Sequence, residues 1–236
     1  MARYFCHEHP DVLTLQTRIV DARPGAVVLQ ESPFHPGGGG QLPDRGQLRW
    51  TGGEVAITGF EAAGGQTWHL LADPVDVSGT VEVSVDPAFR SMMTELHTDT
   101  HILNALVYRQ FAGALVTGAQ LNDDGTARMD FDLPDADNDR LRALEPEIND
   151  AIRQDLPVRY AYVIDSYGGL ERPPNPQALG TRRQSRGAPR SPFGTLDRQA
   201  CGGTHLPSTA RSRPIRILKI DNKGRHNRRV RLGLVD

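Results

Sequence analysis

The first third of the chain alternates short apolar runs with glycine and proline, and this pattern predicts strands. Five runs bounded by turn residues are strand candidates: VLTLQTRIV, AVVLQ, GEVAITGF, TWHLL and TVEVSV. No good helical pattern interrupts them. Successive short strands of this kind are typical of closed antiparallel sheets. We therefore expect a small β-barrel over residues 1–85.

The pattern then changes to a helical period. Apolar residues such as Met92 and Leu96 recur three or four positions apart within VDPAFRSMMTELHTDTHILNALVYRQFAG. Asp86 suits the N-cap, Pro87 suits the first helical position, and Gly113 suits the stop. A long helix is predicted between them.

The remainder of the chain mixes strands with one more helix. ALVTGAQL and ARMDFDL form a predicted hairpin across Asp124-Gly125, and DNDRLRALEPEINDAIRQDLP is a predicted helix that Pro146 should kink or shift. VRYAYVI and the closing IRILKIDNKGRHNRRVRLGL read as strands, whereas residues 168–195 read as a loop. The predicted fold class is α+β. A barrel is followed, over residues 86–236, by helices packed on a mainly antiparallel sheet.

Composition narrows the class of protein. No run of 18 apolar residues is present among the 236, and the N-terminus has no apolar core of a signal peptide. Two cysteines make no disulfide framework. We expect a protein of the reducing cytoplasm with no membrane association.

The net charge of −2 hides a strong asymmetry. Residues 182–231 hold 14 Lys or Arg and two acids. A solvated basic tail is the simpler explanation. However, Ile215, Ile217 and Ile220 alternate with the charges in a strand pattern, which favours a folded basic surface that meets a polyanion such as the phosphates of a nucleic acid.

Two short motifs together predict a metal site. HTDTH places His97 and His101 four residues apart, so both imidazoles leave one face of the predicted helix. CGGTH places Cys201 and His205 beside two flexible glycines. Either motif alone could be accidental, since a lone cysteine is usually a small apolar residue. Together they supply one sulfur and three nitrogen ligands, which suits tetrahedral Zn²⁺.

The H-E-x-x-H motif of zinc proteases is the nearest alternative. Its glutamate is the general base, and Thr98 follows His97 here, so a protease loses its base. Asp99 lies between the histidines but off their face, and we expect it at the surface or as a cap.

HTDTH and CGGTH resemble the second additional domain shared by threonyl- and alanyl-tRNA synthetases. FHPGGGGQLPDRG, residues 34–46, is similar to the glycine-rich segment of alanyl-tRNA synthetase and of its free-standing relatives, the AlaX alanyl-tRNA editing proteins. The closing RILKIDNKGRHNRRVRLGL is similar to their last strands. The resemblance spans nearly the whole chain and includes no aminoacylation domain or ATP motif. It implies a free-standing editor of the medium-length form.

The resemblance implies hydrolysis of tRNA(Ala) mischarged with serine, and of its glycine counterpart. By alignment with the family, Thr117 and Gln120 are the candidates for reading the serine hydroxyl, with ordinary strand positions as the alternative. The acceptor end is expected to approach one stretch of the glycine-rich segment, and charge marks four more residues as phosphate contacts. These candidates for RNA binding are Gly38, Gly39, Gly40, Gln41, Lys223, Arg225, Arg228 and Arg229.

One segment departs from the family pattern. Relatives carry a hydrophobic strand before CGGTH, whereas RRQSRGAPRSPFGTLDRQ has only two large apolar residues, Phe193 and Leu196. A longer basic loop beside the site would explain this. Two other functions stay open. One is a zinc-structured tRNA-binding module without hydrolysis, and the other is hydrolysis of another small ester or amide by the same zinc site, which the basic C-terminal half disfavours.

Overall fold

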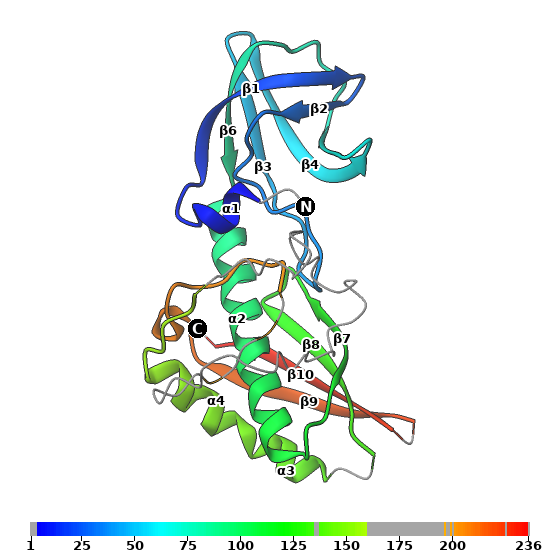
Figure 1. Ribbon diagram of the computed structural model, residues 1–236, viewed down its shortest axis with the longest axis vertical. Coiled ribbons are helices and arrows are strands. Elements are labelled where there is room, and N and C mark those ends of the chain that lie inside the picture. Colours follow the sequence, from blue (N-terminus) through cyan, green and yellow to red (C-terminus); the bar gives the residue numbers. More distant parts are fainter. Residues whose placement is uncertain are drawn as a thin grey trace, which may run out of the picture.

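The computed structural model describes residues 4–134, 137–159, 196, 199, 201–224 and 226–235 (Figure 1). Six antiparallel strands close a barrel in the order β1-β2-β5-β4-β3-β6. Their bounds are β1 (Thr14–Arg23), β2 (Ala26–Leu29), β3 (Gly46–Trp50), β4 (Gly53–Ala63), β5 (Gln66–Leu71) and β6 (Thr80–Val85). The predicted barrel is confirmed.

Every second side chain of the barrel strands points inward and fills the interior of the barrel. On β6, Val81, Val83 and Val85 are buried, while the residues between them are more exposed. The sequence pattern missed β3, because its five residues follow a glycine- and proline-rich segment and carry only two large apolar side chains. Without β3 the barrel would not close, since β3 joins β4 to β6.

A second sheet follows the barrel, with strand order β7-β8-β10-β9 and antiparallel pairing throughout. Its strands are β7 (Val116–Leu121), β8 (Thr126–Asp132), β9 (Ile215–Lys223) and β10 (Asn227–Leu234), and the helices beside it are α2 (Pro87–Gln110), α3 (Asn138–Arg142) and α4 (Leu144–Arg153). α2 runs from the barrel junction along the sheet (Figure 1). The α+β class is confirmed.

The core of this part lies between α2, α4 and one face of the sheet. Leu96 and Leu103 of α2 pack with Met129 and Phe131 of β8 and with Val230 of β10. Every second residue of β8 is buried, which identifies the face turned toward the helices. We refer to this as the inner face of the sheet.

The predicted start of the long helix is confirmed, and the second predicted helix is broken into two. Asp86 caps α2, since its side chain accepts hydrogen bonds from the backbone N–H groups of Ala88 and Phe89. The second predicted helix is divided at Ala143 into α3 and α4, and Pro146 lies in the first turn of α4. Proline is tolerated there because that N–H needs no helical partner.

Two predicted segments cannot be compared with the structure, and one short helix was not predicted. Most of VRYAYVI and the loop over residues 168–195 lie outside the described residues. The short helix α1 (Phe5–Glu8) was not predicted, because one turn is too short to show a period. No described helix is long and apolar enough to cross a membrane.

Candidate metal centre

The predicted metal ligands meet at one point. His97 and His101 leave the same face of α2, and the segment that contains Cys201 and His205 crosses in front of them. The donor atoms of the four residues all lie within 4.8 Å of one another. The Cys201 Sγ is 3.3 Å from the Nε2 of His97 and 3.3 Å from the Nε2 of His205. We call these four residues the Cys201 cluster.

Gln41 fixes the proton position on His97. The Gln41 Oε1 accepts the backbone N–H of Thr204 at 2.9 Å, and because an N–H only donates, this side-chain atom is an oxygen. The Nδ1 of His97 lies 2.7 Å from the same oxygen and must carry a hydrogen. The Nε2 of neutral His97 therefore keeps its lone pair toward Cys201.

Thr98 does the same for His205. Its hydroxyl donates to the backbone carbonyl of Thr94 at 2.8 Å, so its one hydrogen is used. The Thr98 oxygen accepts from the N–H of Leu206 at 3.1 Å and from the Nδ1 of His205 at 3.3 Å. The Nε2 of His205 is thereby also left as an acceptor that faces Cys201.

Burial favours the neutral form of both His97 and His205. His97 is 2% exposed, and burial together with the neighbouring histidines holds its pKa well below the ordinary value. Burial likewise lowers the pKa of His205. In the metal-free protein, burial raises the pKa of the Cys201 thiol to about 11, although backbone N–H groups oppose this. Both imidazoles are therefore neutral, which is the form that binds metal ions.

These donors fit a zinc ion. A tetrahedral ion with Zn–S of about 2.3 Å and Zn–N of about 2.0 Å separates sulfur from nitrogen by about 3.5 Å. Both observed sulfur-to-nitrogen distances in the Cys201 cluster, 3.3 Å, are close to this. The second ring nitrogens of His97 and His205 are held by Gln41 and Thr98, as is usual for metal-bound histidines.

Glycine is required where the chain passes the cluster. A Cβ on Gly203 would lie 1.9 Å from the Cε1 of His97, whereas a Cβ on Gly202 would meet nothing within 4 Å. The four glycines 37–40 all have positive φ, between 64° and 120°, which other residues rarely adopt. This stretch runs close to the cluster, since a Cβ on Gly39 would be 3.9 Å from the same His97 atom.

Two contacts hold the glycine-rich segment against the rest of the site. Gly40 accepts the N–H of Leu121 on β7 through its carbonyl at 2.8 Å. On the other side, buried Asp44 is paired with Arg90 of α2 and accepts the N–H of His35 at 2.6 Å. Gln41, predicted as an RNA contact, is 3% exposed, and its side chain is turned to His97 and Thr204.

Thr117 and Gln120 lie on the other face of the sheet. Gly118 of β7 pairs with Asp130, and Gln120 pairs with Arg128. Gly118 and Gln120 therefore lie on the outer face of the sheet, which is turned away from the helices. Gln120 is exposed and accepts two hydrogen bonds from Arg128. The hydroxyl of Thr117 is 3.4 Å from the side-chain oxygen of Asn227. The structure does not bring either residue to the Cys201 cluster.

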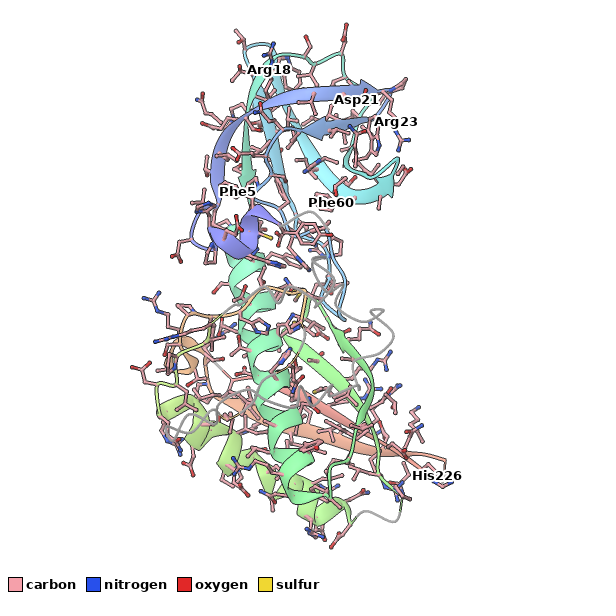
Figure 2. All side chains as sticks on the ribbon, viewed as in Figure 1. Phe5, Arg18, Asp21, Arg23, Phe60 and His226 are labelled. Atoms are coloured by element: carbon pink, nitrogen blue, oxygen red, sulfur yellow. The ribbon has the colours of Figure 1, made fainter. Side chains whose placement is uncertain are left out.

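The basic residues of the β9–β10 hairpin differ in exposure and in their partners. Lys223 is exposed near the tip of the β9–β10 hairpin, where Figure 2 shows His226. Arg229 donates two hydrogen bonds to Asp130, and Arg228 is buried. Arg225 lies outside the described residues.

The prediction for Asp99 was wrong. Asp99 is fully buried, and the hydroxyl of Ser212 donates to its Oδ2 at 2.8 Å. Burial raises its pKa to about 8, although the bond from Ser212 acts the other way. The sequence analysis also missed Thr98 and Thr204, the threonines of the two motifs. Thr98 bonds to His205, and Thr204 bonds to Gln41, which holds His97. Their place inside HTDTH and CGGTH was the available signal.

Comparison with known proteins agrees with this geometry. Residues 193–231 match the family model "Threonyl and Alanyl tRNA synthetase second additional domain". The alanyl-tRNA editing protein AlaX-M of Saccharolobus solfataricus is 32% identical over 226 residues, which cover 90% of this chain and 90% of that protein. The chain belongs to the AlaX-M family of alanyl-tRNA editing proteins. The predicted resemblance is confirmed.

Other relatives divide into two kinds. AlaX-M of Methanosarcina barkeri is 31% identical and is covered over 89% of its length. The alanine–tRNA ligase of Pyrobaculum neutrophilum is also 31% identical, and 86% of this chain matches 23% of that protein. The AlaX-M proteins thus match along nearly their whole length, whereas the ligase matches over one part.

Proposed function

We propose that this AlaX-M family member edits tRNA(Ala) in trans and hydrolyses the ester that joins serine, and secondarily glycine, to the terminal ribose. The Cys201 cluster carries this proposal, because it brings four metal-binding donors together in a chain that matches editing proteins along 90% of its length. The editing function follows from the family. The choice of serine and glycine follows from chemistry.

Alanine, serine and glycine are hard to separate by binding. A pocket for alanine gains or loses only roughly 1–3 kcal/mol from one small group, so a synthetase activates the wrong amino acid at an appreciable rate. A second site that cleaves the wrong ester supplies the missing selectivity. Such a site must recognise the amino acid after it has been joined to tRNA.

Zn²⁺ is the proposed cofactor, with His97, His101, Cys201 and His205 as ligands. With all four residues as ligands, Cys201 and His205 would be held against His97 and His101 of α2, which would order the segment 201–205. With one ligand displaced, it would act as a Lewis acid toward the ester or a water molecule. His205 is held through Thr98 as His97 is held through Gln41, which supports a permanent fourth ligand.

The protein's own groups have separate tasks in this proposal. Gln41 and Thr98 hold the ligand histidines, and the side-chain-free stretch Gly38–Gly40 admits the acceptor end close to the cluster. Lys223, Arg225 and Arg229 are proposed to meet tRNA phosphates, whereas the burial of Arg228 argues against that role for it. A role for Thr117 and Gln120 in reading serine stays a prediction, tested by Thr117→Val and Gln120→Leu.

Hydrolysis of three charged tRNAs tests the function. We expect the protein to release serine and glycine from tRNA(Ala) well above the buffer rate, and to leave Ala-tRNA(Ala) largely intact. Binding of the same tRNAs is measured in parallel. Binding without release of serine or glycine would support the alternative, a zinc-structured tRNA-binding module.

A further inference from the structure

A second group of metal-binding side chains lies at the N-terminal end of the molecule. Cys6 and His7 belong to α1, and His35 comes from the segment just before the glycines. Their donor atoms lie within 4.8 Å of one another. Figure 2 shows Phe5 of α1 at the junction between the barrel and the start of α2. We call these three residues the Cys6 cluster.

His35 is the strongest reason to look for a ligand here. It is 1% exposed, yet neither of its ring nitrogens makes a hydrogen bond of good geometry with the residues that the structure describes, although the backbone of Gly38 is near enough to oppose the lowering of its pKa by burial. Its backbone is fixed, because its N–H donates to Asp44 and its carbonyl accepts the N–H of Asp44. Buried polar atoms are rarely left without partners, so a missing group is indicated.

His7 is tied to the segment that carries Cys201 through one of its ring nitrogens. Its Nε2 lies 3.1 Å from the carbonyl oxygen of Gly202, and because a carbonyl only accepts, this nitrogen carries the hydrogen. In the neutral imidazole, Nδ1 then keeps its lone pair. The bond to Gly202 also connects α1 to the segment that carries Cys201.

Cys6 supplies the sulfur. It is a free cysteine with 1% exposure, and burial raises the pKa of its thiol to about 12, although the charge of Arg90 acts in the opposite direction. The positive charge of Arg90 does not exclude a cation, since Asp44 binds its guanidinium through both carboxylate oxygens. The remaining Nη1 of Arg90 is also buried without a partner in the described part of the chain.

We infer that Cys6, His7 and His35 bind a second metal ion, of the zinc class, separate from the ion proposed at the Cys201 cluster. One thiolate and two imidazoles suit a borderline-soft ion such as Zn²⁺ and disfavour Mg²⁺ or Ca²⁺, which take oxygen ligands. Three protein ligands leave a fourth position for water. Binding converts the Cys6 thiol to a thiolate, and its proton passes to solvent.

The site would join three parts of the molecule. α1 contributes two ligands, the segment before the glycines contributes the third, and His7 holds Gly202 through its other ring nitrogen. A bound ion would thus fix α1 over the glycine-rich segment and beside the Cys201 cluster. The inference does not depend on the editing activity, because metal content is measured without tRNA.

Metal content of the full chain tests the inference. The wild type, saturated with zinc and freed of excess by gel filtration, is expected to hold about two ions per chain, and Cys6→Ser about one. Cys201→Ser should also hold about one, and the double variant about none. His9→Gln, an exposed histidine just after α1, is the matched control and should match the wild type.

Cobalt provides a second readout. Each cluster has one thiolate, so Cys6→Ser should lose about half of the thiolate-to-cobalt charge-transfer absorption of the Co²⁺-loaded wild type. About one zinc in the wild type, with no change in zinc or cobalt absorption in Cys6→Ser, would overturn the inference and assign the nitrogens of His35 to water. If Cys6→Ser misfolds, the metal content of Cys201→Ser still decides, because about one ion per chain supports the inference and none overturns it.

Discussion

The Cys201 cluster and the Cys6 cluster contain the same kinds of donor but differ in how the protein holds them. In the first, Gln41 and Thr98 bind the far ring nitrogens of His97 and His205, so both lone pairs are aimed at one point. In the second, His7 is held by Gly202, but neither ring nitrogen of His35 makes a hydrogen bond of good geometry with the described residues. Hydrogen bonds to the rings orient the first cluster before a metal arrives, whereas packing and the backbone bonds to Asp44 confine His35.

Gly203→Ala should break the Cys201 cluster with the largest effect. Its Cβ would lie 1.9 Å from the Cε1 of His97 and 2.7 Å from the Oε1 of Gln41, so the imidazole must move. We expect zinc at this cluster and deacylation to be lost, while the Cys6 cluster keeps its ion. Gly202→Ala is the matched control, since its Cβ has open space. Equal metal content in both variants would contradict the packing argument.

Gln41→Leu tests the orientation of His97. The variant removes the acceptor for the Nδ1–H of His97 and for the N–H of Thr204, and a loss of zinc affinity of about 10–100-fold is expected. Competition with a chelator measures this. Gln41→Glu keeps the acceptor oxygens and should recover part of the affinity. Gln47→Leu, an exposed glutamine on β3, should change nothing.

Thr98→Val should have a smaller effect on zinc affinity, about tenfold, because its bond to His205 is longer. The variant also leaves the buried N–H of Leu206 without an acceptor, which costs about 1–3 kcal/mol of unfolding free energy. Urea denaturation and chelator competition measure the two effects. Thr98→Ser keeps the oxygen and should restore both; failure to do so would show that the methyl group matters more.

Lys223→Gln should leave both clusters unchanged and weaken only tRNA binding. Lys223 is exposed and takes part in no salt bridge among the residues that the structure describes. Loss of one phosphate contact is expected to lower the slope of log affinity against log salt by about one. Binding titrations at several salt concentrations measure it. An unchanged slope would remove Lys223 from the tRNA surface.

The sequence predicted the Cys201 cluster because its spacing is local. His97 and His101 are one helical turn apart, and Cys201 and His205 are four residues apart, so each pair could be read without a fold. The helix α2 was predicted for the same reason, since Asp86 and Pro87 mark its start. The sulfur and nitrogen donor set then indicated that the two pairs belong together.

The parts that escaped prediction depend on distant contacts. Gln41 reaches His97 from 56 residues away, and the Cys6 cluster joins α1 to His35 across the barrel strands β1 and β2. Asp99 looked like a surface residue because nothing in the sequence shows that Ser212 covers it. Thr117 and Gln120 lie on the outer face because a register shift in β7 sets their direction, and such irregularities leave little trace in the sequence.

Hydrolysis of Ser-tRNA(Ala) by the wild type and by Cys201→Ala, with zinc content and tRNA affinity measured on the same preparations, tests the central claim most directly. We predict that Cys201→Ala loses about one zinc per chain, keeps its tRNA affinity and releases serine no faster than buffer. Release of serine at the wild-type rate by a variant without metal at the Cys201 cluster would contradict the account.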